Sequence, residues 1–170
     1  FLVTLCAVYS FKQWKEILVL ITAFTIGHCA TLVLASLNFL TIKSEIIEFL
    51  IPITIFITSI ANIVQKSENT SKQLRVIKYS SALFFGFIHG LGFANAFESM
   101  VSANESTLLS VLEFALGIEL GQLVIVFCIL FFGFLGQTIF RFSVRDWVMV
   151  LSAVVIGLML PLIFNSPLFS

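Results

Sequence analysis

Two histidines and one glutamate are the residues of this chain best suited to binding a metal ion. His28, His89 and Glu119 each lie well inside a long apolar run of the sequence. A polar group in hydrocarbon is costly, so by default such a residue marks a pathway or a binding site. Imidazole nitrogens and carboxylate oxygens are also ligands that divalent transition metals accept. We therefore predict a metal site made by these three residues near the centre of a bilayer.

The surroundings of His28 favour an ordered imidazole. Thr25 and Thr31 lie three positions before and after it. In a helix each threonine lies about 60° from His28, one on either side, so two hydroxyls flank the ring and are placed to orient it. The alternative is that His28 only forms a hydrogen bond with a neighbouring helix, which is common in membranes.

His89 is surrounded by glycines. Gly86 and Gly90 form a pair of small residues four positions apart, which lets another helix approach closely. We expect Gly92 to loosen the helix and free a backbone carbonyl. The alternative is a packing motif in which the histidine is incidental.

Glu119 is accompanied by two further polar side chains in the same apolar run. Glu119 and Gln122 are three positions apart and so share a helical face. Glu113 points about 120° away from Glu119 in a regular helix. We place Glu113 nearer the outer surface, either guarding an entrance or simply exposed.

The composition indicates that these residues lie on membrane-spanning helices. Hydrophobic residues make up 59% of the 170 residues, charged residues make up 11%, and the mean hydropathy is +1.12. The apolar runs are continuous rather than alternating, which predicts helices and not a barrel. We expect one all-α polytopic membrane domain over residues 1–170, with a truncated first span over 1–10. Five complete spans are predicted at residues 17–37, 46–64, 76–97, 108–135 and 147–164.

The charges predict the orientation of the bundle. Nine Lys and Arg balance nine Asp and Glu, so no basic surplus suggests nucleic acid. Eight of the nine Lys and Arg lie in or beside the joints at 10–16, 65–75 and 141–146, and Lys43 is the exception. Positive residues remain in the cytoplasm, so these joints are predicted to be cytoplasmic, with both chain ends outside the inner membrane.

The three cysteines are interpreted as small buried hydrophobic residues. Cys6, Cys29 and Cys128 all lie in apolar runs and show no CxxC spacing. Cys29 follows His28 directly, which leaves a role with a soft metal as the alternative. Adjacent helix positions point about 100° apart, which makes joint ligation by both awkward.

Taken in order, these motifs resemble the HupE/UreJ family of hydrogenase- and urease-accessory membrane proteins. The resembling segments cover most of the chain and lie at residues 24–28, 89–93 and 113–122. The resemblance implies a small permease for nickel, or sometimes cobalt, that serves metalloenzyme maturation. It places His28, His89 and Glu119 in the metal-handling positions. The family's first span usually brings a further His/Asp motif, whereas the one aspartate here is Asp146.

We therefore expect inward transport of a divalent transition metal, nickel first and cobalt second, and not an enzyme. The ligand set argues against Cu(I), Ca²⁺ and Mg²⁺ but does not separate nickel from cobalt or zinc. No tightly bound cofactor is expected, and the partners are the metal ion, the lipid bilayer and metalloenzyme maturation proteins. One alternative is an intramembrane metal-dependent hydrolase with Glu113 as its base. Another is a membrane accessory protein for hydrogenase or urease assembly that transports nothing.

Overall fold

The computed structural model describes residues 1–37, 39–40, 42–65, 72–100 and 107–169, and no strand occurs among them. Five helices in this part are long and apolar enough to cross a membrane. They are α2 (Trp14–Ser36), α3 (Ser44–Val64), α4 (Lys72–Met100), α5 (Thr107–Ile139) and α6 (Val144–Phe164). The prediction of an all-α bundle with five complete spans is confirmed, and the predicted ends agree within a few residues.

The segment predicted as the end of a first span forms one short helix. This helix, α1 (Leu2–Cys6), packs against α3, α5 and α6 inside the bundle. A turn and the 3₁₀ helix η1 (Phe11–Gln13) then lead directly into α2, and a second 3₁₀ helix, η2 (Pro167–Phe169), follows α6. Asn62 on α3 donates a hydrogen bond to the carbonyl of Thr4, which ties α1 to its neighbour.

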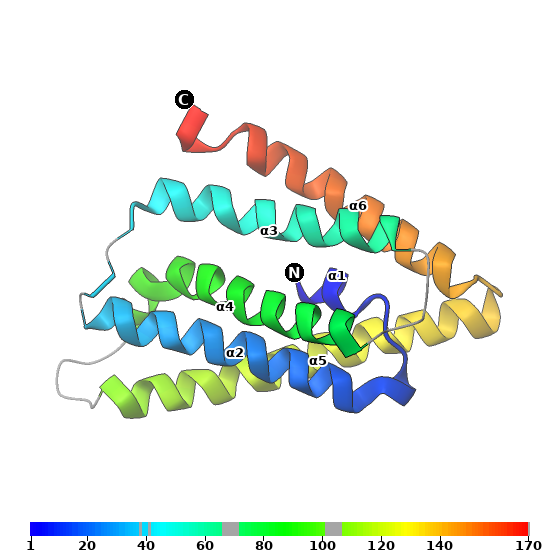
Figure 1. Ribbon diagram of the computed structural model, residues 1–170, viewed down its shortest axis with the longest axis horizontal. Coiled ribbons are helices and arrows are strands. Elements are labelled where there is room, and N and C mark those ends of the chain that lie inside the picture. Colours follow the sequence, from blue (N-terminus) through cyan, green and yellow to red (C-terminus); the bar gives the residue numbers. More distant parts are fainter. Residues whose placement is uncertain (38, 41, 66–71, 101–106, 170) are drawn as a thin grey trace.

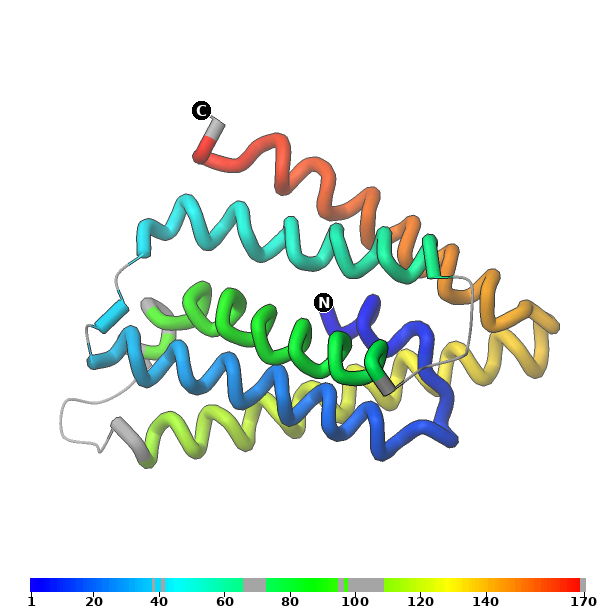
Figure 2. The backbone as a smooth tube through the Cα atoms, viewed as in Figure 1, coloured from blue at the N-terminus to red at the C-terminus, as the bar shows by residue number. Residues whose placement is uncertain are grey.

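Consecutive long helices run in opposite directions, as successive membrane spans must (Figure 1). The chain path in Figure 2 shows that the start of α2, the end of α3 and the end of α5 lie at one end of the bundle. These helix ends adjoin the three joints predicted to be cytoplasmic. Residues 66–71 and 101–106 lie outside the described residues, so Lys66 and most of the predicted joint at 98–107 are not placed. Which end faces the cytoplasm stays a prediction.

The closest helix pair in the bundle is α2 with α4, which run parallel to each other. Three glycines, Gly27 on α2 with Gly86 and Gly90 on α4, form what we call the glycine seam. A Cβ atom at any of them would collide with the backbone of the other helix. The predicted role of Gly86 and Gly90 in close helix contact is therefore confirmed, because no larger residue fits at this spacing.

A second pair, α3 with α6, is joined at the end that carries the three joints. Arg145, near the start of α6, donates hydrogen bonds to the carbonyls of Ile63 and Gln65, where α3 ends. A cation at this position satisfies carbonyls that have no partner within the helix. The start of α6 is itself capped, since Ser143 and Asp146 each bind the other's backbone N–H.

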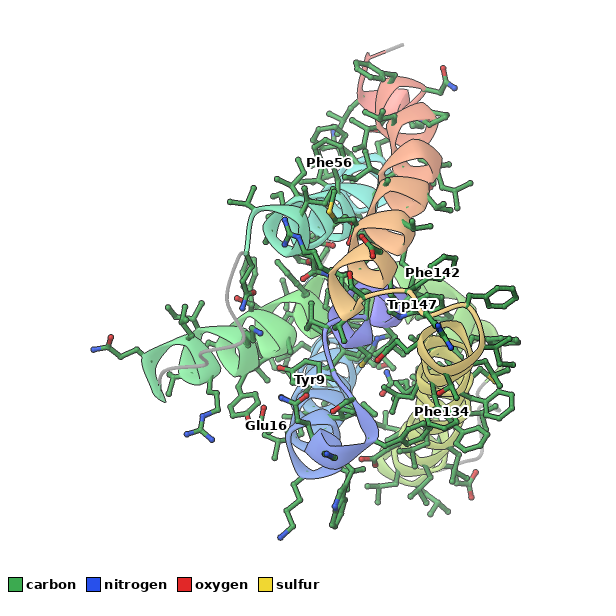
Figure 3. All side chains as sticks on the ribbon, turned by 90° about the vertical axis from the view of Figure 1, so that its right-hand side faces the viewer. Tyr9, Glu16, Phe56, Phe134, Phe142 and Trp147 are labelled. Atoms are coloured by element: carbon green, nitrogen blue, oxygen red, sulfur yellow. The ribbon has the colours of Figure 1, made fainter. Side chains whose placement is uncertain are left out.

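Viewed from the same end, Figure 3 shows the aromatic residue Trp147 at the start of α6, on the side of α5. Its indole lies against Gly133 of α5. Glu16, at the start of α2, forms an ion pair of 3.6 Å with Arg75 of α4. These two contacts join α6 to α5 and α2 to α4 at this end of the bundle.

Candidate functional site

His28 is a buried imidazole in an aromatic surrounding. Its side chain on α2 is 2% exposed, and neither ring nitrogen has a hydrogen-bond partner among the described residues. The rings of Phe24, Phe93 and Phe114 lie 5.9, 5.3 and 6.1 Å from it between centroids. They come from α2, α4 and α5, so His28 lies where these three helices meet. Buried polar groups are rarely left without partners, and those that are call for an explanation.

The two threonines beside His28 are engaged elsewhere. Thr25 donates its hydroxyl hydrogen to Gln122 Oε1 of α5 at 3.1 Å. Thr31 donates to the backbone carbonyl of His28, at 2.9 Å, and not to its ring. The hydrogen bonds that were expected to orient the imidazole are therefore not present. An amide oxygen on the next helix and a carbonyl of the same helix bind these hydroxyls instead.

His89 on α4 is half-buried and held by one side chain. Its Nε2 lies 3.1 Å from the Thr54 hydroxyl oxygen on α3. The Phe24 ring contacts this imidazole too, with centroids 5.4 Å apart. Phe24 thus contacts both histidines of the chain, which the glycine seam brings to the same region of the bundle.

Gly92 does not have the predicted role. The helix α4 continues through it, so no backbone carbonyl is freed by a break there. The space beside Gly92 is filled by the side chain of Ile51, which packs against α4 from α3. The glycine serves the contact between α3 and α4 instead.

Glu119 and Gln122 share one face of α5, as predicted, and this face meets α2. Glu119 Oε1 accepts a hydrogen bond of 2.9 Å from the Thr22 hydroxyl, and Gln122 accepts from Thr25. Thr22 precedes His28 by six residues, which is about 9 Å along the helix axis. Glu119 therefore lies at a different depth from His28. Glu113 is exposed on α5, in keeping with its predicted place away from the interior.

The three predicted ligands do not gather into one cluster. Within the part of the chain that the structure describes, no three His, Cys, Asp or Glu residues lie close enough to hold a metal ion. The described polar groups form a row instead, which we call the polar row. Along α2 and its neighbours it consists of Thr22 with Glu119, Thr25 with Gln122, His28, and His89 with Thr54. Such a row offers several separate positions to a passing cation rather than one chelating site.

Sequence reasoning missed two hydroxyls that bind predicted site residues. Thr22 had a usable signal, since Thr22, Thr25, His28 and Thr31 recur every three residues, each about 60° around α2 from the one before. Thr54 had none, because nothing in the sequence of its apolar helix distinguishes it and only the packing of α3 on α4 brings it to His89. Phe24, which contacts both imidazoles, appeared in the motif without a role.

Comparison with known proteins agrees with the motifs. The profile of the family described as HupE / UreJ protein matches residues 1–165, nearly the whole chain. No curated protein and no solved structure gives a significant match. With five helices able to span a bilayer, this is a membrane protein, and the chain belongs to the HupE/UreJ family.

Proposed function

We propose that this protein moves a divalent transition metal ion across the inner membrane into the cytoplasm, to supply hydrogenase or urease maturation. Nickel is the first candidate and cobalt the second. The observation that carries the proposal is His28, whose two buried ring nitrogens have no partner among the described residues. Leaving a buried polar group without a partner costs about 1–3 kcal/mol. A metal ion that visits the ring would offset this cost, and the imidazole is then a transient ligand.

The arrangement of the polar row supports movement rather than permanent binding. Thr22, Thr25 and His28 succeed one another at steps of about 4.5 Å along α2. Each is paired with, or lies beside, a different side chain of α5, namely Glu119, Gln122 and Phe114. Conduction requires binding that is strong enough to admit the ion and divided enough to release it. A membrane potential negative inside adds about 2.3 kcal/mol per charge per 100 mV, which favours inward movement of a dication.

The two alternatives make different demands on the same residues. A hydrolase would need Glu113 as a base beside bound metal, and the exposed position of Glu113 gives this no support. An accessory protein that transports nothing would tolerate substitution of either histidine without any change in metal uptake. Uptake measurements on matched variants therefore distinguish the candidates.

The test uses the full-length protein in sealed proteoliposomes with an imposed potential and limiting Ni²⁺, Co²⁺ or Zn²⁺. We expect His28→Ala to lower nickel uptake by about tenfold or more, the scale at which metal-binding groups matter. Phe132→Ala is the matched control, since Phe132 is an exposed side chain on α5. Wild-type uptake by folded His28→Ala, or no metal uptake by the unaltered protein, would overturn the proposal.

A further inference from the structure

The hydroxyl of Thr54 lies between two groups that both require a hydrogen. Its Oγ1 is 2.7 Å from the backbone carbonyl oxygen of Ile51 and 3.1 Å from Nε2 of His89. Thr54 is 4% exposed, so water does not readily replace either contact. Both distances are within hydrogen-bonding range, and each contact therefore needs one hydrogen between its heavy atoms.

The sources of these two hydrogens are determined by the chemistry of the groups. A carbonyl oxygen only accepts, so the contact with Ile51 must contain the single hydrogen of the Thr54 hydroxyl. The hydroxyl then has only lone pairs left for His89. The hydrogen in the second contact must therefore belong to Nε2 of the imidazole. In a neutral imidazole the other nitrogen, Nδ1, then carries the lone pair.

The packing of α3 on α4 keeps these groups in register. Ile51 lies against Gly92, and Thr54 lies against His89. The two contacts are three residues apart on each helix. The residue number increases from Ile51 to Thr54 on α3 and decreases from Gly92 to His89 on α4. This is the spacing expected of one antiparallel helix interface, so a single packing arrangement accounts for both contacts.

We propose that Thr54 is a positioning residue that holds His89 as the tautomer with hydrogen on Nε2, leaving Nδ1 as the nitrogen that binds the metal substrate. Only the last clause rests on the proposed transport function. Nδ1 is bonded to the ring carbon that carries the side chain, so an ion bound there lies closer to the α4 backbone than one at Nε2. Thr54 thereby decides on which side of the imidazole the substrate binds.

The test is nitrogen NMR of the intact protein labelled with ¹⁵N-histidine, at about pH 8.5, where a free imidazole is neutral. His28→Asn leaves His89 as the one histidine of this chain, which assigns the signals. We expect a proton-bearing Nε2, a lone-pair signal at Nδ1, and an Nε2–H proton shifted downfield by its hydrogen bond. Thr54→Val should move that proton upfield and mix the tautomers, whereas Thr54→Ser should restore the parent spectrum.

A proton on Nδ1 in the parent protein overturns the proposal, as does a spectrum that Thr54→Val leaves unchanged. The parent measurement stands even if Thr54→Val fails to fold. Added Zn²⁺, which is diamagnetic, should shift Nδ1 more than Nε2, and the reverse order overturns the assignment of the binding nitrogen. The expected tautomer without any response to zinc would uphold the positioning role and count against the transport function.

Discussion

Gly27 of α2 lies directly against Leu83 of α4, whose carbonyl oxygen occupies the space that a Cβ atom at Gly27 would need. From the other side, Gly90 leaves room for the backbone of α2 at His28. Each histidine is thus the chain neighbour of a seam glycine, His28 of Gly27 and His89 of Gly90. The separation of the two imidazoles is therefore governed by contact between two backbones, which gives little when compressed.

Substituting the glycine seam should separate the helices and destabilise the bundle. We expect Gly27→Leu, Gly86→Leu or Gly90→Leu to lower the free energy of unfolding by about 1–3 kcal/mol or more, the usual cost of overpacking. Thermal unfolding in detergent measures this. Gly117→Leu is the matched control, because nothing lies within 4 Å of a Cβ built there. A seam variant as stable as the control would contradict the packing role of these glycines.

Removing the other two predicted ligands should also reduce metal uptake. We expect His89→Ala and Glu119→Gln each to lower nickel uptake by about tenfold or more, because each removes a group that we propose binds the ion. Both variants should remain folded. Glu113→Gln serves as the control, since Glu113 is an exposed carboxylate of the same helix. Uptake at the level of the unaltered protein in both variants, at matched protein density, would argue against a role for either residue.

Nickel uptake should decrease as the pH falls through the range in which histidines gain a proton. A protonated imidazole has no lone pair for a metal and adds a positive charge that repels the cation. For ordinary histidines this range is centred near about pH 6.5, so initial rates between about pH 8 and 5 cover it. The potential must be clamped at each pH. An unchanged or rising rate on acidification would contradict this prediction.

The orientation inferred from the positive charges can be checked by cysteine labelling in intact cells. In a variant without Cys6, Cys29 and Cys128, Lys43→Cys should react with a reagent that cannot cross the membrane. Phe142→Cys, an exposed position at the opposite end of the bundle (Figure 3), should react only after the cells are opened. The opposite pattern would reverse the orientation and with it the direction assigned to transport.

The spans could be predicted from the sequence because they depend on local composition. A continuous apolar run has to bury its backbone polar groups in a helix wherever it crosses the bilayer, whatever its neighbours are. The close approach at Gly86 and Gly90 was predictable for a related reason, since small residues four positions apart create a groove on the helix itself. Gly92 shows the limit of this reasoning, because α4 continues through it as a regular helix and Ile51 of α3 packs against it.

The site was harder to predict, because its hydrogen bonds depend on how far one helix is shifted along another. Glu119 was expected level with His28, yet its partner is Thr22, six residues away along α2. Residue counts from the predicted ends of two spans do not determine this shift when the helices differ in length. The Thr54 contact with His89 likewise exists only through the register of α3 on α4. The sequence could thus indicate which polar residues are candidates for the site, but not which residues form hydrogen bonds with them.

The parallel contact of α2 with α4 constrains the order in which the protein is assembled. These helices are not consecutive, so α3 must cross the membrane and the chain must return before Gly27 can meet Gly86 and Gly90. Until then, His28 of α2 lies in the bilayer without α4 and α5, the helices that enclose it in the finished bundle. If the helices enter the membrane in chain order, the newly made protein passes through a stage with α2 and α3 inserted and the polar face of α2 uncovered. At that stage lipid, a membrane insertase or a metal ion can reach residues that are enclosed in the finished bundle.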